Sequence, residues 1–280
     1  MRAEPRPGRG ASCGEIGTLS AQEFALFRDL IYSLAGIALS DGKQVLVSGR
    51  LMRRLKELGL TSYGEYYRLV TSGQHPEEQQ RMVDLLTTNE TYFFRESKHF
   101  DFLAELARAN GSRPFQVWSA ASSSGEEAYS AAMVLAETLG LAAPWQILGS
   151  DISLQVLERA RQGHYSLERT DGIPPGLLRK YCLKGVRAQA GTFLIGRELR
   201  EHVVFRQVNL IAPLPDLPAC DVIFLRNVMI YFDQETKRKV VANLASRLKP
   251  GGHFIIGHSE TLNGICETLK SIAPTIYRKP

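Results

Sequence analysis

The chain has 280 residues, enough to bury a sizeable core as one large domain or two smaller ones. Its composition, 44% apolar and 22% charged, is typical of globular proteins, and it holds no stretch of about 20 uncharged apolar residues, which excludes a membrane-spanning helix. A net charge of +5 and a pI near 9.0 indicate either an acidic partner or a mildly basic surface without one.

The first 17 residues, "MRAEPRPGRGASCGEIG", contain no apolar run, so we expect a flexible tail and no signal peptide. Cysteines and histidines show no Cys-x-x-Cys or His-Glu-x-x-His spacing, which predicts neither a disulfide framework nor a metal centre. The four cysteines are Cys13, Cys182, Cys220 and Cys266. These features favour a reduced, cytoplasmic protein.

Residues 18–90 show only helical patterns. Ser20 with Glu23, and Ser62 with Glu65, have the spacing of capping boxes, in which each side chain satisfies the other residue's backbone N–H. Between them, "QVLVSGRLMRRLKELGL" places leucines on one face and ends at Gly59 as a C-cap. The sequence therefore predicts an N-terminal helical domain, with a linking helix over 91–112.

From about residue 113, short apolar runs alternate with helical segments. The runs "FQVWSA", "WQILGSD", "CDVIFLRN" and "GGHFIIGHS" suit strands buried on both faces. Helices are expected over Glu126–Leu139, Ser153–Gln162 and Gln234–Leu248, the last with Asp233 as N-cap. This alternation predicts an α/β domain over 113–280 with a parallel, doubly wound sheet, and two β-rich runs without a long helix between them predict a small inserted β element over about 164–203.

The stretch "VWSAASSSGEEAYSAAMVL" resembles a strand, a turn and a helix where α/β proteins bind nucleotides. Its turn has a single glycine, Gly125, followed by Glu126 and Glu127. Two carboxylates would repel a pyrophosphate but suit a cation, and S-adenosylmethionine (SAM) carries a sulfonium and an ammonium group. Asp151, at the end of the next predicted strand, could accept hydrogen bonds from ribose hydroxyls. The alternative is that the glutamates form capping boxes with Ser123 or Ser124.

Several segments, in the same order, resemble the CheR family of SAM-dependent methyltransferases that esterify glutamates of bacterial chemoreceptors. The resemblance runs from about residue 18 to the end and implies a Rossmann-like SAM-dependent methyltransferase domain with a small β-subdomain behind an all-α domain. The segments are "LTTNETYFFRESKHF", "VWSAASSSGEEAYS", "GSDIS", "VNL", "IFLRNVMIYFD" and "LKPGGHFIIGHSE".

The resemblance also implies a set of site residues. Arg95 and Tyr231 would lie closest to the reacting methyl group as catalytic residues, although "YFFR" alone suits an aromatic core patch and Tyr231 a core tyrosine. The cofactor would contact Asn89, Thr91, Arg95, Glu126, Asp151, Asn209, Leu210, Arg226 and Asn227. The product would be S-adenosylhomocysteine, and no metal is expected.

The expected partner is the helical, carboxylate-rich methylation region of chemoreceptors, with recruitment of the enzyme to membrane-bound receptor arrays but no insertion into the membrane. Arg50, Arg53 and Arg54 form a basic strip that could dock such a helix, or could be a solvated helix face. Some family members grip a receptor peptide through a Gly-x-Gly turn, and Gly185-Val186-Arg187 stands here instead, which argues against peptide tethering.

Two other functions fit parts of the pattern. A nucleic-acid methyltransferase would explain the basic pI, but the Asn/Asp-Pro-Pro-aromatic turn that grips a flipped base is replaced by "RNVMIYF", so no nucleic-acid partner is expected. A non-enzymatic SAM-binding scaffold or sensor in a signalling complex is the other alternative.

Overall fold

The computed structural model describes residues 16–280 and divides them into two compact units. The first unit holds residues up to 32 and 39–86, and the second holds 33–38 and 87–280. Most of the expected tail of residues 1–17 lies outside the described residues, although Gly17 donates its N–H to the carbonyl of Thr61 at 3.0 Å.

The first unit is built from helices, as the pattern predicted. Both predicted capping boxes are confirmed: Glu23 N–H donates to Ser20 Oγ at 3.2 Å while Ser20 N–H donates back to Glu23 Oε2 at 2.9 Å, and Ser62 and Glu65 do the same. Gly59 ends its helix in the left-handed conformation (φ 68°). The helices are α1 (Ala21–Ala35), α2 (Gln44–Leu58, after a 3-10 turn η1, Asp41–Lys43), α3 (Tyr63–Thr71) and α4 (Pro76–Leu86).

The second unit contains a seven-stranded sheet in the order β6-β2-β1-β7-β8-β10-β9. Strands β6, β2, β1, β7 and β8 are parallel, and the C-terminal β10 and β9 add an antiparallel edge. The strands are β1 (Phe115–Ala120), β2 (Trp145–Asp151), β6 (Val203–Gln207), β7 (Cys220–Leu225), β8 (Leu248–Ile256), β9 (Lys270–Ala273) and β10 (Ile276–Arg278). The predicted doubly wound fold is confirmed, while the two C-terminal strands were not anticipated.

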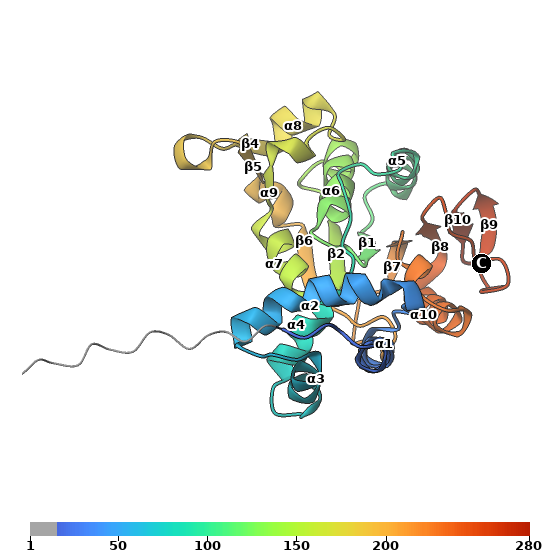
Figure 1. The fold of residues 1–280 in the computed structure, drawn as a ribbon. Helices are drawn as coiled ribbons and strands as arrows, with labels where there is room; N and C mark the ends of the chain where they lie inside the picture. Colours follow the sequence, from blue (N-terminus) through green and yellow to red (C-terminus); the bar gives the residue numbers. More distant parts are fainter. Residues whose placement is uncertain (1–15) are drawn as a thin grey trace, which may run out of the picture. The chain divides into compact units, whose positions relative to one another are not determined.

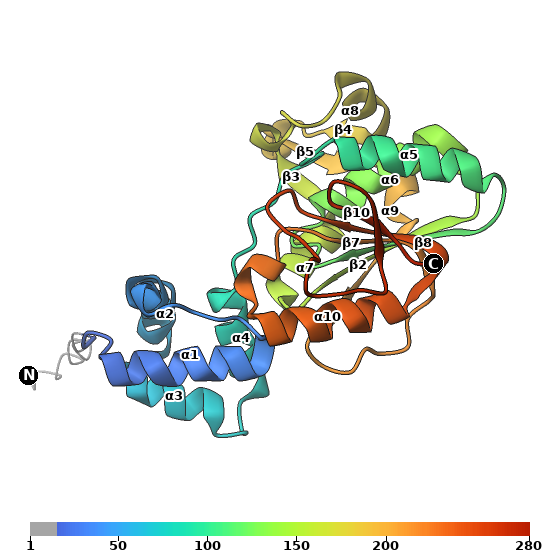
Figure 2. The ribbon, with the colours of Figure 1, turned by 90° about the vertical axis from the view of Figure 1, so that its right-hand side faces the viewer.

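Helices cover both faces of this sheet, with α5 and α6 on one face and α10 on the other (Figure 2). Alternate strand residues face the two layers: Val117 packs with the α5 and α6 side, whereas Trp118 packs with the α10 side. The helices are α5 (Lys98–Asn110), α6 (Glu126–Leu139), α7 (Leu154–Gln162) and α10 (Gln234–Ser246, preceded by the 3-10 turn η4, Met229–Tyr231). Asp233 caps α10, as predicted, by accepting from Thr236 N–H at 2.8 Å.

A second, three-stranded antiparallel sheet, β3-β5-β4, forms the predicted inserted β element (Figure 1). Its third strand ends at Ile195, and the β-rich run that begins at Val203 instead joins the main sheet as β6 beside β2. The elements are β3 (His164–Ser166), η2 (Leu167–Arg169), α8 (Pro175–Tyr181), β4 (Cys182–Lys184), η3 (Arg187–Gln189) and β5 (Thr192–Ile195), followed by α9 (Arg197–Arg200).

The turn after β4 keeps the first glycine of a Gly-x-Gly turn and has Arg187 in place of the second. A Cβ on Gly185 would lie 2.0 Å from the carbonyl oxygen of Gln189, so this position accepts only glycine. Arg187 adopts a left-handed backbone (φ 54°) where the second glycine would stand. The absence of peptide tethering through this turn stays a prediction.

Candidate functional site

The order of the strands reverses at β1, with β2 on one side and β7 on the other. Ligands of open α/β sheets bind outside the carboxyl ends of the strands at such a switch point. Here that place is formed by the turn over 121–125, and Ala121 and Ser123 in it have left-handed backbones (φ 67° and 49°). Non-glycine residues in this conformation are strained and cluster at functional sites.

Helix α6 begins at Glu126 with Gly125 as its N-cap, and no side chain caps it. The predicted capping boxes with Ser123 or Ser124 are therefore wrong. The left-handed turn directs both hydroxyls elsewhere: Ser123 Oγ donates to the carbonyl of Asn89 at 3.0 Å, and Ser124 Oγ donates to Glu126 Oε2 at 2.7 Å. Neither glutamate therefore takes part in a capping box at the start of α6.

Glu126 is completely buried, and its other oxygen pairs with Arg169 from η2 of the β-subdomain. The side chain of Arg169 is 46% exposed. Burial raises the pKa of Glu126, although the bonds from Ser124 and Arg169 oppose this shift. A buried carboxylate whose main cationic partner is half in water is suited to exchange that partner for a cationic ligand.

Glu127 points instead into a buried ion network. It accepts from Ser119 Oγ at 2.6 Å and from Arg226 Nη1 at 2.8 Å. Arg226, whose side chain is 2% exposed, also binds Glu96 Oε2 at 3.0 Å and the carbonyl of Arg95. Burial disfavours the charged form of Glu96, but Arg226 and the N–H of His258 hold its pKa below the ordinary value.

The carboxylate of Asp151 secures the turn from the neighbouring strand. It accepts from the N–H of Ser123 at 2.9 Å and from the N–H of Ser153 at 3.0 Å. The carbonyl of Asp151 accepts from Val208 N–H at 3.0 Å, which brings the segment with Asn209 and Leu210 beside it.

The side chains of that neighbouring segment have structural contacts. Asn209 Nδ2 donates to the carbonyl of Leu34 at 2.7 Å, and its Oδ1 accepts from Ile211 N–H at 3.2 Å. Leu210 is 8% exposed and lies in the hydrophobic layer on the α10 side. The segment lies beside the end of β2, and its contact with the cofactor stays a prediction.

The segment before α5 lies against this turn and against α6. The Asn89 carbonyl accepts from Ser123, and Phe94 N–H donates to Ser130 Oγ at 2.9 Å. Thr91 lies between these two anchors and is half-buried. Arg95 Nη1 donates to the carbonyl of Glu90 at 3.2 Å, and its guanidinium lies 5.6 Å from the centre of the exposed Tyr92 ring. Only weak contacts therefore hold the Arg95 side chain.

The turn after β7 carries Asn227 and leads into η4, which ends at Tyr231. Asn227 has a left-handed backbone (φ 58°), and its Nδ2 reaches Glu96 Oε1 at 3.4 Å. The carbonyl of Tyr231 accepts from Ala38 N–H at 2.8 Å. Across residues 16–280, no hydrogen bond to the Tyr231 hydroxyl is found, and none joins Tyr231 to Arg95.

Glu260 holds this turn and was not anticipated from the sequence. Its Oε2 accepts from Asn227 N–H (2.9 Å) and Gly257 N–H (2.8 Å), and its Oε1 accepts from Met229 N–H (2.8 Å). Burial raises the pKa of Glu260 against these backbone donors, which lower it. Arg169 and Glu96 were missed in the same way, because their partners lie far away in the chain.

The basic strip of the first unit is only partly available. Arg54 Nε donates to the buried Glu78 at 2.9 Å and holds the pKa of Glu78 below its ordinary value. Arg50 Nη1 donates to the carbonyl of Leu86 at 2.9 Å. Arg53 is 89% exposed and pairs with Glu57 at 3.0 Å on its own helix. Of the three, Arg53 is the one whose charge faces solvent.

No helix among the described residues is long and apolar enough to cross a bilayer. Two family models match the chain in consecutive order. "CheR methyltransferase, all-alpha domain" matches residues 22–87, and "CheR methyltransferase, SAM binding domain" matches residues 89–278.

Curated relatives match nearly the whole chain. It is 43% identical to "Chemotaxis protein methyltransferase" of Escherichia coli K12, over 92% of this chain and 91% of that protein. It is also 43% identical to "Chemotaxis protein methyltransferase 2" of Pseudomonas aeruginosa PAO1 (91% and 92%) and 41% identical to the Salmonella typhimurium LT2 protein (92% and 90%). With a helical unit followed by a SAM binding domain whose strand ends carry buried acids, the chain belongs to the CheR methyltransferase family.

Proposed function

We propose that this protein transfers a methyl group from SAM to glutamate carboxylates of chemoreceptors, forming glutamyl methyl esters that adjust receptor signalling. The observation that carries the proposal is the placement of two buried acids within a SAM binding domain, Glu126 at the start of the helix that follows β1 and Asp151 at the end of the neighbouring β2. The names of the relatives supply the chemotaxis context. The same context favours a cytoplasmic location at receptor arrays.

The residues at the switch point suit a cofactor that is cationic and free of phosphate. Glu126 offers a buried carboxylate, and the Asp151 carboxylate lies at the end of β2 beside the turn over 121–125. Ser122 Oγ is buried in the same turn and has no hydrogen-bond partner among residues 16–280. Unpaired buried polar atoms are costly, so this hydroxyl is suited to meet a polar group of a ligand.

When bound, SAM would supply a methyl group on a sulfonium; the acceptor oxygen would form the new C–O bond as the C–S bond breaks, and S-adenosylhomocysteine would leave. The acceptor is a glutamate carboxylate, and with an ordinary pKa of about 4.3 it is already ionised at neutral pH. The nucleophile therefore needs no general base, and the chain's task is to align it and to exclude water. Arg95 and the Tyr231 hydroxyl, neither held by a strong partner, are proposed to bind the carboxylate through the oxygen that does not attack.

Labelling with methyl-labelled SAM and a receptor cytoplasmic fragment tests the proposal. Alkali should release the label as methanol, because it hydrolyses a carboxyl ester but not an N-methyl bond. A receptor fragment with its methylated glutamates changed to alanine is the control. Alkali-stable label on nucleic acid, or no label on any substrate, would contradict the proposal.

Substitution of Arg95 separates catalysis from cofactor binding. We expect Arg95→Ala to lower kcat by at least about tenfold and to leave the Kd for SAM nearly unchanged, since positioning groups contribute to the transition state. Tyr231→Phe should act in the same direction. Arg113→Ala, before β1 at the opposite ends of the strands, is the matched control. A normal rate for Arg95→Ala would contradict the assignment of Arg95 to the active site.

Receptor docking is proposed to rely on the exposed Arg53. Arg53→Glu should raise the apparent KM for the receptor and weaken the dependence of KM on salt, because fewer charge pairs form. Arg54→Glu would instead break the pair with Glu78 and lower the stability of the first unit. Arg68→Glu, an exposed arginine on α3, serves as control. Equal KM values for all variants would contradict docking at this strip.

A further inference from the structure

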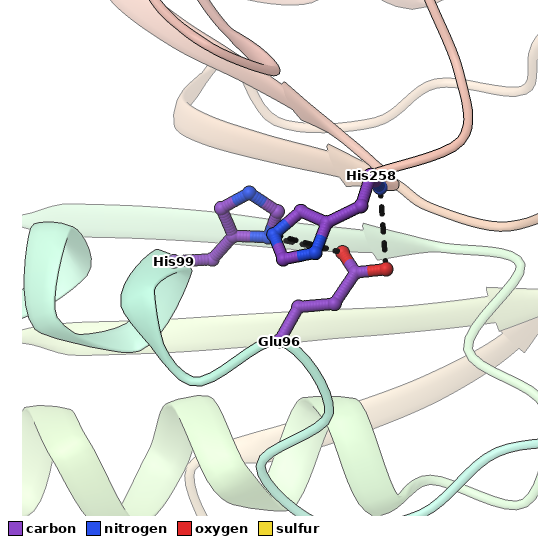
Figure 3. A group of neighbouring side chains, drawn as sticks. All are labelled: Glu96, His99 and His258. Atoms are coloured by element: carbon purple, nitrogen blue, oxygen red, sulfur yellow. Dashed lines mark hydrogen bonds and ion pairs between the residues drawn. The ribbon is translucent and has the colours of Figure 1, made fainter.

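Three potential metal ligands from two distant segments converge next to the site. Glu96 lies just before α5, His99 lies in its first turn, and His258 follows β8 (Figure 3). Glu96 Oε2 lies 3.5 Å from His99 Nδ1 and 4.0 Å from His258 Nε2, and the three ligand atoms lie within 4.8 Å of one another. The rings of His99 and His258 meet edge to face, 5.2 Å apart.

His99 carries a lone pair that no group in the described part of the chain satisfies. The ring is 2% exposed, and its Nε2 lies 2.8 Å from Thr275 Oγ1. The Thr275 hydroxyl donates to the carbonyl of Pro274, so it accepts from His99, and we infer that Nε2 carries the proton. Nδ1 is then an acceptor without a hydrogen-bond partner, facing a carboxylate oxygen. Two acceptor atoms 3.5 Å apart repel each other unless a proton or a cation lies between them.

The charges around this place also leave room for a cation. Glu96 and Glu127 both bind the single guanidinium of Arg226, and all three side chains are at least 88% buried. Two carboxylates against one guanidinium leave one negative charge unbalanced.

We propose that Glu96 Oε2, His99 Nδ1 and His258 Nε2 form a binding site for a divalent ion of the zinc class. Two imidazoles and one carboxylate are a common zinc set, and bonds of about 2.0–2.1 Å in a tetrahedron place ligand atoms about 3.4 Å apart. The Glu96–His99 spacing already meets this value, and the 57% exposed His258 can move to meet it. Magnesium and calcium prefer oxygen ligands.

The surroundings supply the outer contacts that metal ligands need. Thr275 fixes the tautomer of His99, and Arg226 donates to the ligating Glu96 Oε2 through Nε at 3.3 Å and Nη2 at 3.0 Å. Solvent can take the fourth position beside the exposed His258. A bound ion would fasten the start of α5 to the loop after β8, two segments now joined at Glu96 by its bond to His258 N–H at 3.2 Å.

Zinc binding to the full chain tests the site. Equilibrium dialysis should give one Zn²⁺ per chain, and Co²⁺ should give a tetrahedral d–d spectrum without thiolate charge-transfer bands. His258→Ala, at an exposed position, should weaken binding by at least about tenfold, and Thr275→Val should weaken it by about tenfold to a hundredfold with recovery in Thr275→Ser. Zn²⁺ should also raise the Tm of the parent protein.

His164→Ala is the matched control, because His164 is an exposed histidine of the β-subdomain whose Nε2 bonds Thr192. It should bind zinc as the parent does. Zinc bound equally by His258→Ala and the parent, a cobalt spectrum with thiolate bands, or no stoichiometric zinc would each overturn the proposal. These measurements do not depend on methyl transfer, so a failure of the zinc site would not contradict the proposed function.

Discussion

Glu126 and Glu127 are neighbours in the first turn of α6, yet their surroundings are opposite. Glu127 is bound to Arg226, an arginine 2% exposed that is held by two acids and a carbonyl. Glu126 is more deeply buried, but its arginine, Arg169, comes from the β-subdomain and is 46% exposed. The difference lies in the partner, not in the depth of the glutamate.

This contrast separates a structural acid from an exchangeable one. Breaking the Glu127 pair would leave charges buried with nothing to replace them, so that pair belongs to the permanent framework. The Glu126 pair can open by moving one half-solvated side chain, provided that a cationic ligand takes its place at the buried carboxylate. The first turn of α6 thus carries Glu127, which stabilises the fold, next to Glu126, which is suited to bind a ligand.

Removal of Arg226 should give the largest effect. Arg226→Ala leaves Glu96 and Glu127 buried without their cation, and we expect the free energy of unfolding to fall by about 3–5 kcal/mol. Urea unfolding followed by circular dichroism measures it. Arg238→Ala, at an exposed arginine of α10, should change stability little. Equal stability of both variants would show that the network is not part of the framework.

Isosteric changes of the two glutamates test the division directly. Glu126→Gln should raise the Kd for SAM about tenfold to a hundredfold, the loss expected for a charged hydrogen bond. Glu127→Gln should leave that Kd within about threefold and lower the Tm instead. Calorimetric titration and thermal unfolding measure the two quantities. A raised Kd in Glu127→Gln with an unchanged Kd in Glu126→Gln would instead assign ligand binding to Glu127.

The pH dependence of cofactor affinity follows from the raised pKa of Glu126. Affinity should be full above that pKa and should fall as pH decreases through it, at a higher pH than an exposed glutamate would require. For folding the sign is opposite, because a carboxyl group whose pKa is raised in the folded state favours that state as it protonates. Measuring Kd from about pH 8 to about pH 5 should show the decline, and Glu126→Gln should flatten it.

The smallest effect is expected for Arg169. A cationic ligand at Glu126 competes with this arginine, so Arg169→Ala should lower the Kd for SAM by about two- to fivefold, as fits a half-exposed ion pair. Arg179→Ala, at an exposed arginine of α8, is the control. A Kd that rises in Arg169→Ala alone would mean that Arg169 itself binds the cofactor.

The fold followed from local patterns. Apolar runs gave four parallel strands, and two capping boxes were correct because both partners lie within one helical turn. The same spacing failed at Ser123 and Ser124 because left-handed residues redirect these hydroxyls. The last two strands escaped notice because they are short and pair antiparallel at the sheet edge.

Local patterns correctly placed Glu126 at the start of a helix, Asp151 at the end of β2 and Asn227 just after β7. The site was not predictable where a pair forms across the chain: Arg226 meets Glu96 over 130 residues, and His258 meets the same carboxylate over 162. No spacing rule covers such distances, so the sequence around His99 shows no metal-ligand pattern. The catalytic and cofactor roles stay predictions.

The short segment 33–38 lies early in the chain but belongs to the larger unit. Leu34 accepts from Asn209, Ala38 donates to Tyr231, and a Cβ on Gly36 would lie 2.7 Å from Ile211. The boundary between the two units therefore does not fall at a single point in the sequence. A truncation or chimera joined at residue 87 would separate residues 33–38 from the unit to which they belong. A chimera that exchanges the two units intact must take residues 33–38 and 87–280 from the same parent protein.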